Sequence, residues 1–97
     1  MAEDRLVRQL KALAHPTRLG MLQRLALEPE ICACDLGEAF AVSQPTVSEH
    51  LRVLREAGLV TTRRRGTTIC YSAVPEALSE LATVVAALHP RETAEAA

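Results

Sequence analysis

Three cysteines carry the most distinctive side-chain chemistry in this 97-residue sequence: Cys32, Cys34 and Cys70. Thiolates are soft ligands that bind thiophilic ions such as Cd(II), Pb(II), Zn(II) or Cu(I). Side chains two residues apart on a regular helix point about 200° away from each other, so Cys32 and Cys34 can share one ion only if Cys32 lies at or before a helix start. With that placement the pair is a candidate ion-binding site. The alternative is two small, buried structural cysteines.

The same thiols could respond to oxidation instead of to an ion. Cys32 and Cys34, or one of them with Cys70, would then form a disulfide or polysulfide bridge. An odd number of cysteines argues against a structural disulfide scaffold. A thiol oxidoreductase is a poor match, because Cys32 and Cys34 are not a C-x-x-C pair and no βαβ unit surrounds them.

A second group of polar side chains is suited to contact DNA. Ser43 is a good N-cap, Pro45 is tolerated in a first turn and Gly58 can close a helix, which together predict a helix over residues 43–57. Its polar face carries five candidate DNA-binding residues, which are Gln44, Thr46, Ser48, Glu49 and Arg52. An α-helix fits the major groove, where polar side chains near its N-terminus can reach base edges. The alternative is an ordinary solvated face, and His50 is expected to pack against neighbouring apolar residues.

Arginines crowd the segment that follows this helix. Arg63, Arg64 and Arg65 precede Gly66 within a stretch of β-branched residues, which predicts a β-hairpin over residues 59–72. Alternate side chains of a strand face opposite sides, so the three arginines cannot all point to one surface unless they reach the turn. Such arginines suit phosphates or the minor groove. The alternative is an exposed charged edge that deters aggregation.

The distribution of charge favours a nucleic-acid partner, although the net charge is only −1. Residues 40–72 carry five arginines against two glutamates, whereas residues 28–38 and 73–97 are acidic. A basic segment on an otherwise acidic small domain is typical of a nucleic-acid contact. With Phe40 and Tyr71 as the only aromatic residues, an aromatic platform for base stacking is excluded.

Length and composition restrict the remaining classes of protein. Ninety-seven residues make a single domain, residues 1–97, which is too small for a large catalytic cleft with a lid, so we expect no enzyme. No apolar run approaches the ~20 residues that span a bilayer. The acidic N-terminus lacks the apolar core of a signal peptide. We therefore expect a cytoplasmic protein with no membrane partner.

The elements that must position these side chains are predicted to be four helices, a hairpin and a last helix. Apolar spacing and proline or glycine boundaries place the helices over residues 4–14, 16–29, 33–40, 43–57 and 75–89. The short third helix, a tight turn and the polar fourth helix make a helix-turn-helix, and the basic hairpin makes a wing. The predicted fold class is mainly α with a two-stranded β-hairpin wing, a winged helix-turn-helix.

The last helix carries an apolar seam with heptad-like spacing, formed by Leu78, Leu81, Val85 and Leu88. This seam exceeds what one small core can cover, so the first and last helices are expected to form a homodimer. Residues 91–97 are expected to be a frayed tail.

Four stretches of the chain resemble the arsenic-repressor (ArsR/SmtB) family, over roughly residues 5–88. They begin at His15, Cys32, Ser43 and Leu54 and read H-P-T-R-L, C-A-C-D-L, S-Q-P-T-V-S-E-H-L and L-R-E-A-G-L-V. Their combination is specific, although each stretch alone would be modest. The resemblance implies a homodimeric winged-helix repressor that leaves double-stranded operator DNA when a metal ion or metalloid binds. It implies As(III) or Sb(III) as inducer at Cys32 and Cys34, with Cd(II), Pb(II) or Zn(II) as alternatives.

The cysteine pattern departs from that family at one position. Many arsenic repressors add a third cysteine where Gly37 stands here, and no cysteine precedes Cys32 as in the family's cadmium and lead sensors. Cys70 is a candidate third ligand if the second hairpin strand, or a partner subunit, brings it to the pair. A three-sulfur site would suit As(III), whereas tetrahedral Zn(II) or Cd(II) would need a fourth ligand. A buried strand residue is the alternative for Cys70.

The family's second metal site, on the last helix, is expected to be absent. His89 and Glu92 match its final pair, but Pro90 stands between them. Upstream, Glu76 and Leu78 occupy the positions of the other ligands, and leucine cannot bind a metal ion.

Overall fold

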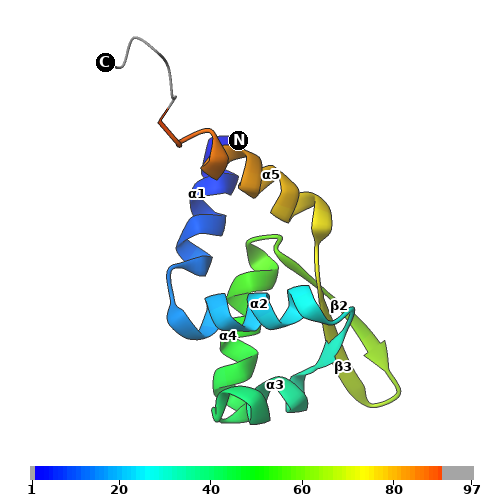
Figure 1. The fold of residues 1–97 in the computed structure, drawn as a ribbon. Coiled ribbons are helices and arrows are strands. Elements are labelled where there is room, and N and C mark those ends of the chain that lie inside the picture. The colour runs from blue at the N-terminus through cyan, green and yellow to red at the C-terminus, as the bar shows by residue number, and fades with distance from the viewer. Residues whose placement is uncertain (1, 91–97) are drawn as a thin grey trace.

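The computed structural model describes residues 2–90; Glu92 and the expected tail at 91–97 lie outside that range. Figure 1 shows the described elements, which in chain order are α1 (Ala2–Leu13), α2 (Pro16–Leu27), β1 (Ile31–Cys32), α3 (Ala33–Phe40), α4 (Gln44–Glu56), β2 (Val60–Arg65), β3 (Thr68–Ala73) and α5 (Pro75–Ala86). The predicted winged helix-turn-helix, with five helices and a hairpin, is confirmed.

The described sheet has three antiparallel strands in the order β1-β3-β2, one more than the predicted hairpin. β2 and β3 pair along their whole length around a turn at Gly66, whose φ of 65° favours glycine. β1 pairs with the other edge of β3, where Ile31 lies opposite Tyr71 and Cys32 opposite Cys70. A two-residue strand has no alternating pattern, so sequence periodicity could not predict it.

Aliphatic side chains from α2, α3, α4 and the start of β2 form the core. Six large ones are completely buried: Met21, Leu36, Val47, Leu51, Leu54 and Leu59. Each such burial stabilises the fold by ~1.5–3 kcal/mol. Phe40 packs so closely on Gly20 that a Cβ at that glycine would lie 2.8 Å from the ring. These contacts hold α3 against α2 and against the inner face of α4.

The helix-turn-helix has the boundaries that its sequence predicts. Ala41 ends α3 in the left-handed conformation, with a φ of 54°. Two residues later Ser43 caps α4, because its Oγ accepts a hydrogen bond from the Thr46 backbone N–H at 3.4 Å. Gly58, with a φ of 80°, follows the other end of α4.

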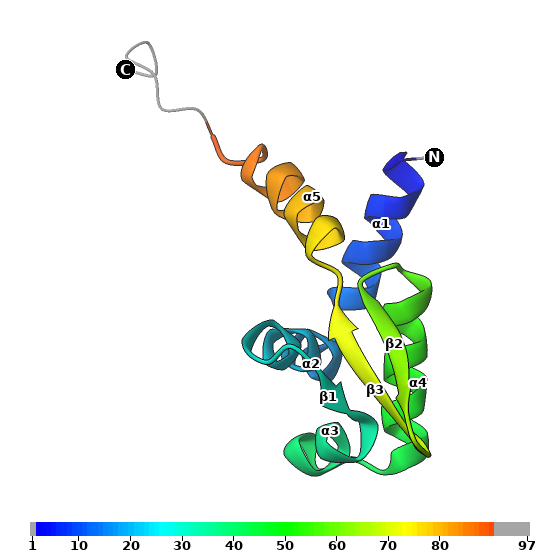
Figure 2. The same ribbon diagram turned by 90° about the vertical axis from the view of Figure 1, so that its right-hand side faces the viewer.

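The helices α1 and α5 extend from the same end of the molecule, opposite α3 and the tip of the hairpin (Figures 1 and 2). An ion pair between Arg5 and Glu80, at 2.7 Å, links them. Their exposed apolar side chains are Val7 and Leu10 on α1 and Val85 on α5, and Leu88 is exposed in the turn just after α5. Leu81 corrects the predicted seam, because it is only 6% exposed and belongs to the core. No helix among residues 2–90 is long and apolar enough to cross a membrane.

Candidate DNA interface and thiol site

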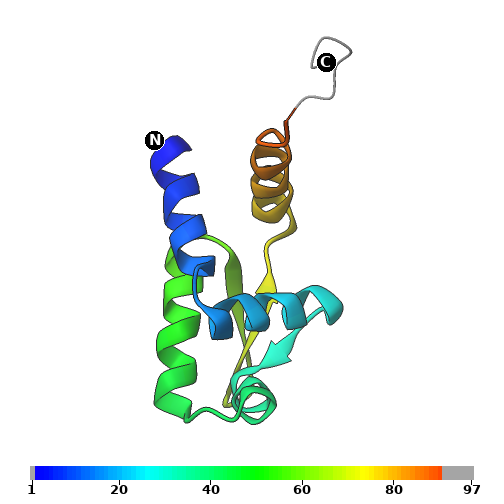
Figure 3. The same cartoon turned by 60° about the vertical axis from the view of Figure 1, so that its left-hand side comes forward.

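The exposed face of α4 carries all five of the polar residues predicted to contact DNA: Gln44, Thr46, Ser48, Glu49 and Arg52. The N-terminal end of α4 lies beside α3, at the end of the molecule opposite α1 and α5 (Figure 3). The Ser43 hydroxyl donates to Thr46 Oγ1 at 3.0 Å, so the cap also orients the Thr46 side chain. The Gln44 amide lies against Gly37, where an added Cβ would collide with it. The exposed Gln44 side chain can move away, but the buried Val47 side chain would also lie only 3.3 Å from that Cβ.

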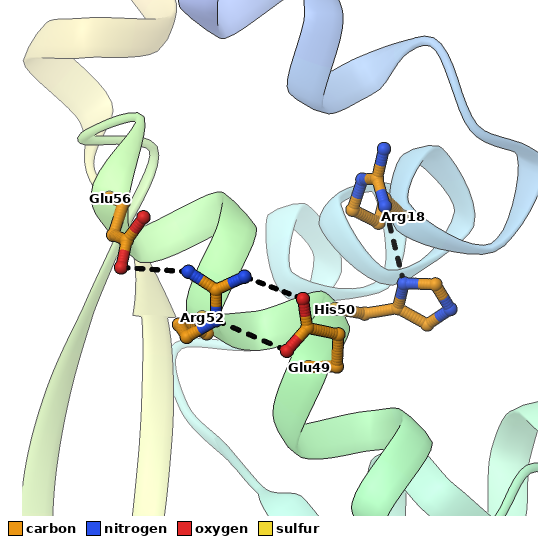
Figure 4. Close-up of polar contacts among 5 residues, drawn as sticks. All are labelled: Arg18, Glu49, His50, Arg52 and Glu56. Carbon is orange, nitrogen blue, oxygen red and sulfur yellow. Dashed lines mark hydrogen bonds and ion pairs between the residues drawn. The ribbon is translucent and has the colours of Figure 1, made fainter.

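Arg52 is held between two carboxylates on the surface of α4 (Figure 4). Its Nη2 donates to Glu49 Oε2 at 2.5 Å, and its Nη1 donates to Glu56 Oε2 at 2.9 Å. The hydrogen bond from Arg52 holds the pKa of Glu49 below its ordinary value, and the two carboxylates raise the pKa of Arg52. In this structure the charge of Arg52 is therefore neutralised. This pairing was not predicted, although the i,i+3 and i,i+4 spacings of the three residues indicate it.

The three arginines of the hairpin face two sides, as strand alternation predicts. Arg63 and Arg65 both bind Glu30: Arg63 Nε lies 3.2 Å from Glu30 Oε2, and Arg65 Nη1 lies 3.0 Å from Glu30 Oε1. Arg64 points the other way and makes no ion pair within the described part of the chain. The role of Glu30 was missed, because the acidic stretch at residues 28–38 gave no indication of which carboxylate meets the hairpin.

The cysteines are arranged differently from the predicted pair. Cys32 is the N-cap residue of α3, so the expectation that it lies at a helix start is confirmed. Its partner is Cys70: the two Cα atoms are 3.9 Å apart across β1 and β3, and the sulfurs are bonded. Cys34 is exposed in the first turn of α3, with its Sγ 4.0 Å from Asp35 Oδ1. The structure thus joins Cys32 to Cys70 and leaves Cys34 apart.

The described residues contain no group of three or more His, Cys, Asp or Glu side chains arranged to hold a metal ion. A three-sulfur site would therefore need the Cys32–Cys70 bond to be reduced and the start of α3 to move. An open pocket of about 470 Å³ lies beside this point, bounded by α2, β1, α3 and the hairpin. Cys32, Glu30 and Arg65 line it together, so the thiol and the hairpin share one surface.

His50 is half-buried on the side of α4 that faces α2, where it contacts polar residues and not the apolar neighbours that the sequence predicted. Its ring lies 4.6 Å from that of His15, centroid to centroid, and Arg18 Nη1 lies 3.4 Å from His50 Nδ1 (Figure 4). Burial lowers the pKa of His50, and the nearby charges of His15 and Arg18 lower it further, against a smaller opposing effect of Glu49. His15 also caps α2, because its Nδ1 accepts the Thr17 backbone N–H at 3.1 Å.

The family described as "Bacterial regulatory protein, arsR family" matches residues 15–62, which run from the start of α2 into β2. A solved structure described as a "Possible transcriptional regulator for arsenical resistance" is 36% identical and superposes with a TM-score of 0.77, covering 86% of this chain and 85% of its own. The chain belongs to the arsR family. It has a winged helix-turn-helix fold, and its matches are regulators rather than enzymes.

Two further proteins are similar to this chain. The arsenic resistance transcriptional regulator ArsR1 of Pseudomonas putida is 46% identical over 66 residues, which are 68% of this chain and 52% of that protein. The chain thus spans about half the length of this curated relative. The reduced form of HlyU from Vibrio cholerae is 30% identical with a TM-score of 0.71, covering 92% of this chain and 94% of its own.

Proposed function

We propose that this arsR-family protein represses transcription by binding double-stranded operator DNA, with α4 in the major groove and the hairpin on the backbone. The observation that supports this best is the common location of the two elements that carry the candidate DNA-contacting side chains. The N-terminal end of α4 and the tip of the hairpin lie at the same end of the molecule (Figures 1 and 3). In this arrangement Gln44, Thr46 and Ser48 reach base edges, while Arg64 contacts a phosphate or the minor groove.

The repressor is proposed to act as a homodimer. Four exposed apolar side chains support this, because Val7 and Leu10 on α1 and Val85 and Leu88 at the end of α5 and just after it leave apolar surface exposed on the two helices that lie away from α3. Pairing them around a two-fold axis would present two copies of α4 to successive major grooves, ~34 Å apart.

The inducer is proposed to be As(III) or Sb(III), bound by Cys32 and Cys34, with Cd(II), Pb(II) or Zn(II) as alternatives. Both residues lie at the amino end of α3, which packs behind α4 through Leu36. Drawing two thiolates onto one ion would tilt α3 and misplace α4. Cys70, opposite Cys32, supplies a third sulfur when it is reduced, and three sulfurs suit the pyramidal coordination of As(III).

A second candidate is a thiol-redox switch, and the bond between Cys32 and Cys70 specifically favours it. In this reaction the two thiols lose two protons and two electrons to an oxidant such as a peroxide or a disulfide, and one S–S bond forms. The bond ties β1 to β3 directly before α3, so oxidation would also act on the helix that supports α4. HlyU, a structural relative, is known in a reduced form.

Release of DNA tests these proposals. A DNA site is first selected from a random library by the protein, and its release is measured under reducing conditions against As(III), Sb(III), Cd(II), Pb(II), Zn(II) and Cu(I). Release by the oxidant diamide is measured separately without reductant. Failure to select any DNA sequence would contradict DNA-binding repression itself.

Single serine variants separate the two effectors. Under the metalloid proposal, Cys32→Ser and Cys34→Ser bind DNA normally but lose release by As(III). Under the redox proposal, Cys32→Ser and Cys70→Ser lose release by diamide, whereas Cys34→Ser keeps it and serves as the matched control. A Cys32→Ser variant that still responds fully to both effectors would place the sensor elsewhere.

A further inference from the structure

One carboxylate connects the hairpin arginines to the strand that carries Cys32. The Glu30 side chain is only 18% exposed, and it accepts both Arg63, at 3.2 Å, and Arg65, at 3.0 Å. These arginines are 60% or more exposed, so the carboxylate is the more buried partner and the arginines are accessible to DNA phosphates. In this structure Glu30 thus neutralises the charge of two of the three hairpin arginines, so these two are not free to contact DNA phosphates.

The position of Glu30 depends on β1, which follows it immediately. β1 is only two residues long, and it is attached to β3 through the register of Ile31 with Tyr71 and of Cys32 with Cys70. The second of these positions is the bonded cysteine pair. Cys32 is only two residues from Glu30 in the sequence. A chemical change at Cys32 can therefore shift the backbone that positions the Glu30 carboxylate.

We propose that Glu30 is a positioning residue that transmits the state of Cys32 to the DNA-contacting hairpin. This inference rests on the proposed function and names the route of its regulation. When Cys32 is bonded to Cys70, directly or through an ion that Cys70 also binds, β1 is fixed on β3 and Glu30 stays on Arg63 and Arg65. When Cys32 is free, the short ladder alone holds β1, and DNA phosphates displace Glu30 from the arginines. The effector thus lowers DNA affinity by keeping two cations of each hairpin neutralised.

The number of arginines that Glu30 binds determines the expected change in DNA affinity. Each arginine that gains a phosphate steepens the dependence of log K on log salt by ~0.9. Two exposed ion pairs together change an equilibrium by roughly two- to thirtyfold. Removing the carboxylate should therefore raise DNA affinity within that range, mostly in the effector-bound protein, where Glu30 is held in place.

Glu30→Gln is the direct test, and Glu28→Gln is its matched control. Glu28 precedes Glu30 by two residues and borders the same pocket, but it pairs with Arg24 of α2, at 3.0 Å, and not with the hairpin. Both variants change the net charge equally. DNA affinity is measured across salt concentrations for each, with arsenite in reducing buffer and with diamide without reductant. Titration of free thiols verifies that arsenite or diamide has reacted.

We expect Glu30→Gln to reduce the effector-induced loss of affinity by roughly two- to thirtyfold, while Glu28→Gln keeps the wild-type response. The double variant Arg63→Ala/Arg65→Ala removes the partners of Glu30. It should lower the DNA affinity measured without effector, and adding Glu30→Gln to it should have no further effect. If wild type releases DNA and Glu30→Gln behaves like Glu28→Gln, the role of Glu30 is refuted and the proposed function stands. If wild-type protein neither binds DNA nor responds to a thiol reagent, the proposed function fails, and the role of Glu30 with it.

Discussion

A charge placed on the exposed face of α5 should disrupt the homodimer. Val85 is 48% exposed, so an interface can bury about half of its side chain. Burying a whole valine is worth at least ~1.5 kcal/mol, so half is worth ~0.75 kcal/mol in each protomer and ~1.5 kcal/mol in a symmetric dimer. Val85→Asp loses this amount and adds a desolvated carboxylate from each protomer. We therefore expect the dimer dissociation constant to rise by at least about tenfold.

Sedimentation over a range of protein concentrations measures that constant, and binding to the selected DNA site is measured in parallel. Leu27→Asp is the matched control, because Leu27 is 81% exposed at the end of α2, away from the exposed apolar side chains of α1 and α5. Leu81 is unsuitable for this test, since its 6% exposure means that a charge there would disturb the protomer itself. A Val85→Asp protein that keeps the wild-type dissociation constant and DNA affinity would refute the assignment of this face.

Three further predictions concern single side chains. Arg64→Ala should weaken binding to all DNA sequences alike and flatten the slope of log K against log salt by ~0.9 per phosphate contact; an unchanged slope would exclude a phosphate contact. Because the pKa of His50 lies below its ordinary value of 6.5, the unfolded chain takes up this proton first, so stability falls as pH drops from about 7 towards the folded pKa. Denaturant unfolding of His50→Gln should lack this component, and an identical pH profile would contradict it. Gly37→Cys should not restore a three-cysteine site but should destabilise the fold by ~1–3 kcal/mol, because its Cβ would lie 3.3 Å from the buried Val47 side chain and 3.4 Å from the Val42 carbonyl oxygen; a variant of wild-type stability would contradict this packing.

Local signals predicted the helix-turn-helix correctly. Ser43, Pro45 and Gly58 each act within one turn of their own position, through a cap, a fixed φ and a positive φ. The boundaries of α4 could therefore be predicted from the sequence without knowledge of any distant contact. The same holds for the alternation of the hairpin arginines, because it follows from strand geometry alone.

The thiol site could not be predicted in the same way, because its geometry depends on pairing between distant segments. Cys32 and Cys70 are 38 residues apart, and only the register of β1 on β3 brings them together. The choice of Glu30 as partner of the hairpin arginines depends on the same register. The apolar seam of α5 shows a related limit: heptad spacing identifies an apolar stripe, but it cannot tell that Leu81 packs inside the protomer and Val85 does not.

The arrangement around Cys32 explains how a small effector could control DNA binding without a large rearrangement. Allosteric coupling between two sites typically amounts to 1–3 kcal/mol. The chain holds two ion pairs between Glu30 and the hairpin arginines, and exposed pairs are worth ~0.2–1 kcal/mol each, or ~0.4–2 kcal/mol together. Exchange of these pairs for phosphate contacts is therefore of the size needed to supply a large part of the coupling. A tilt of α3 would add to this exchange, because Cys32 both ends β1 and caps α3, so one chemical event reaches the hairpin and α4 together.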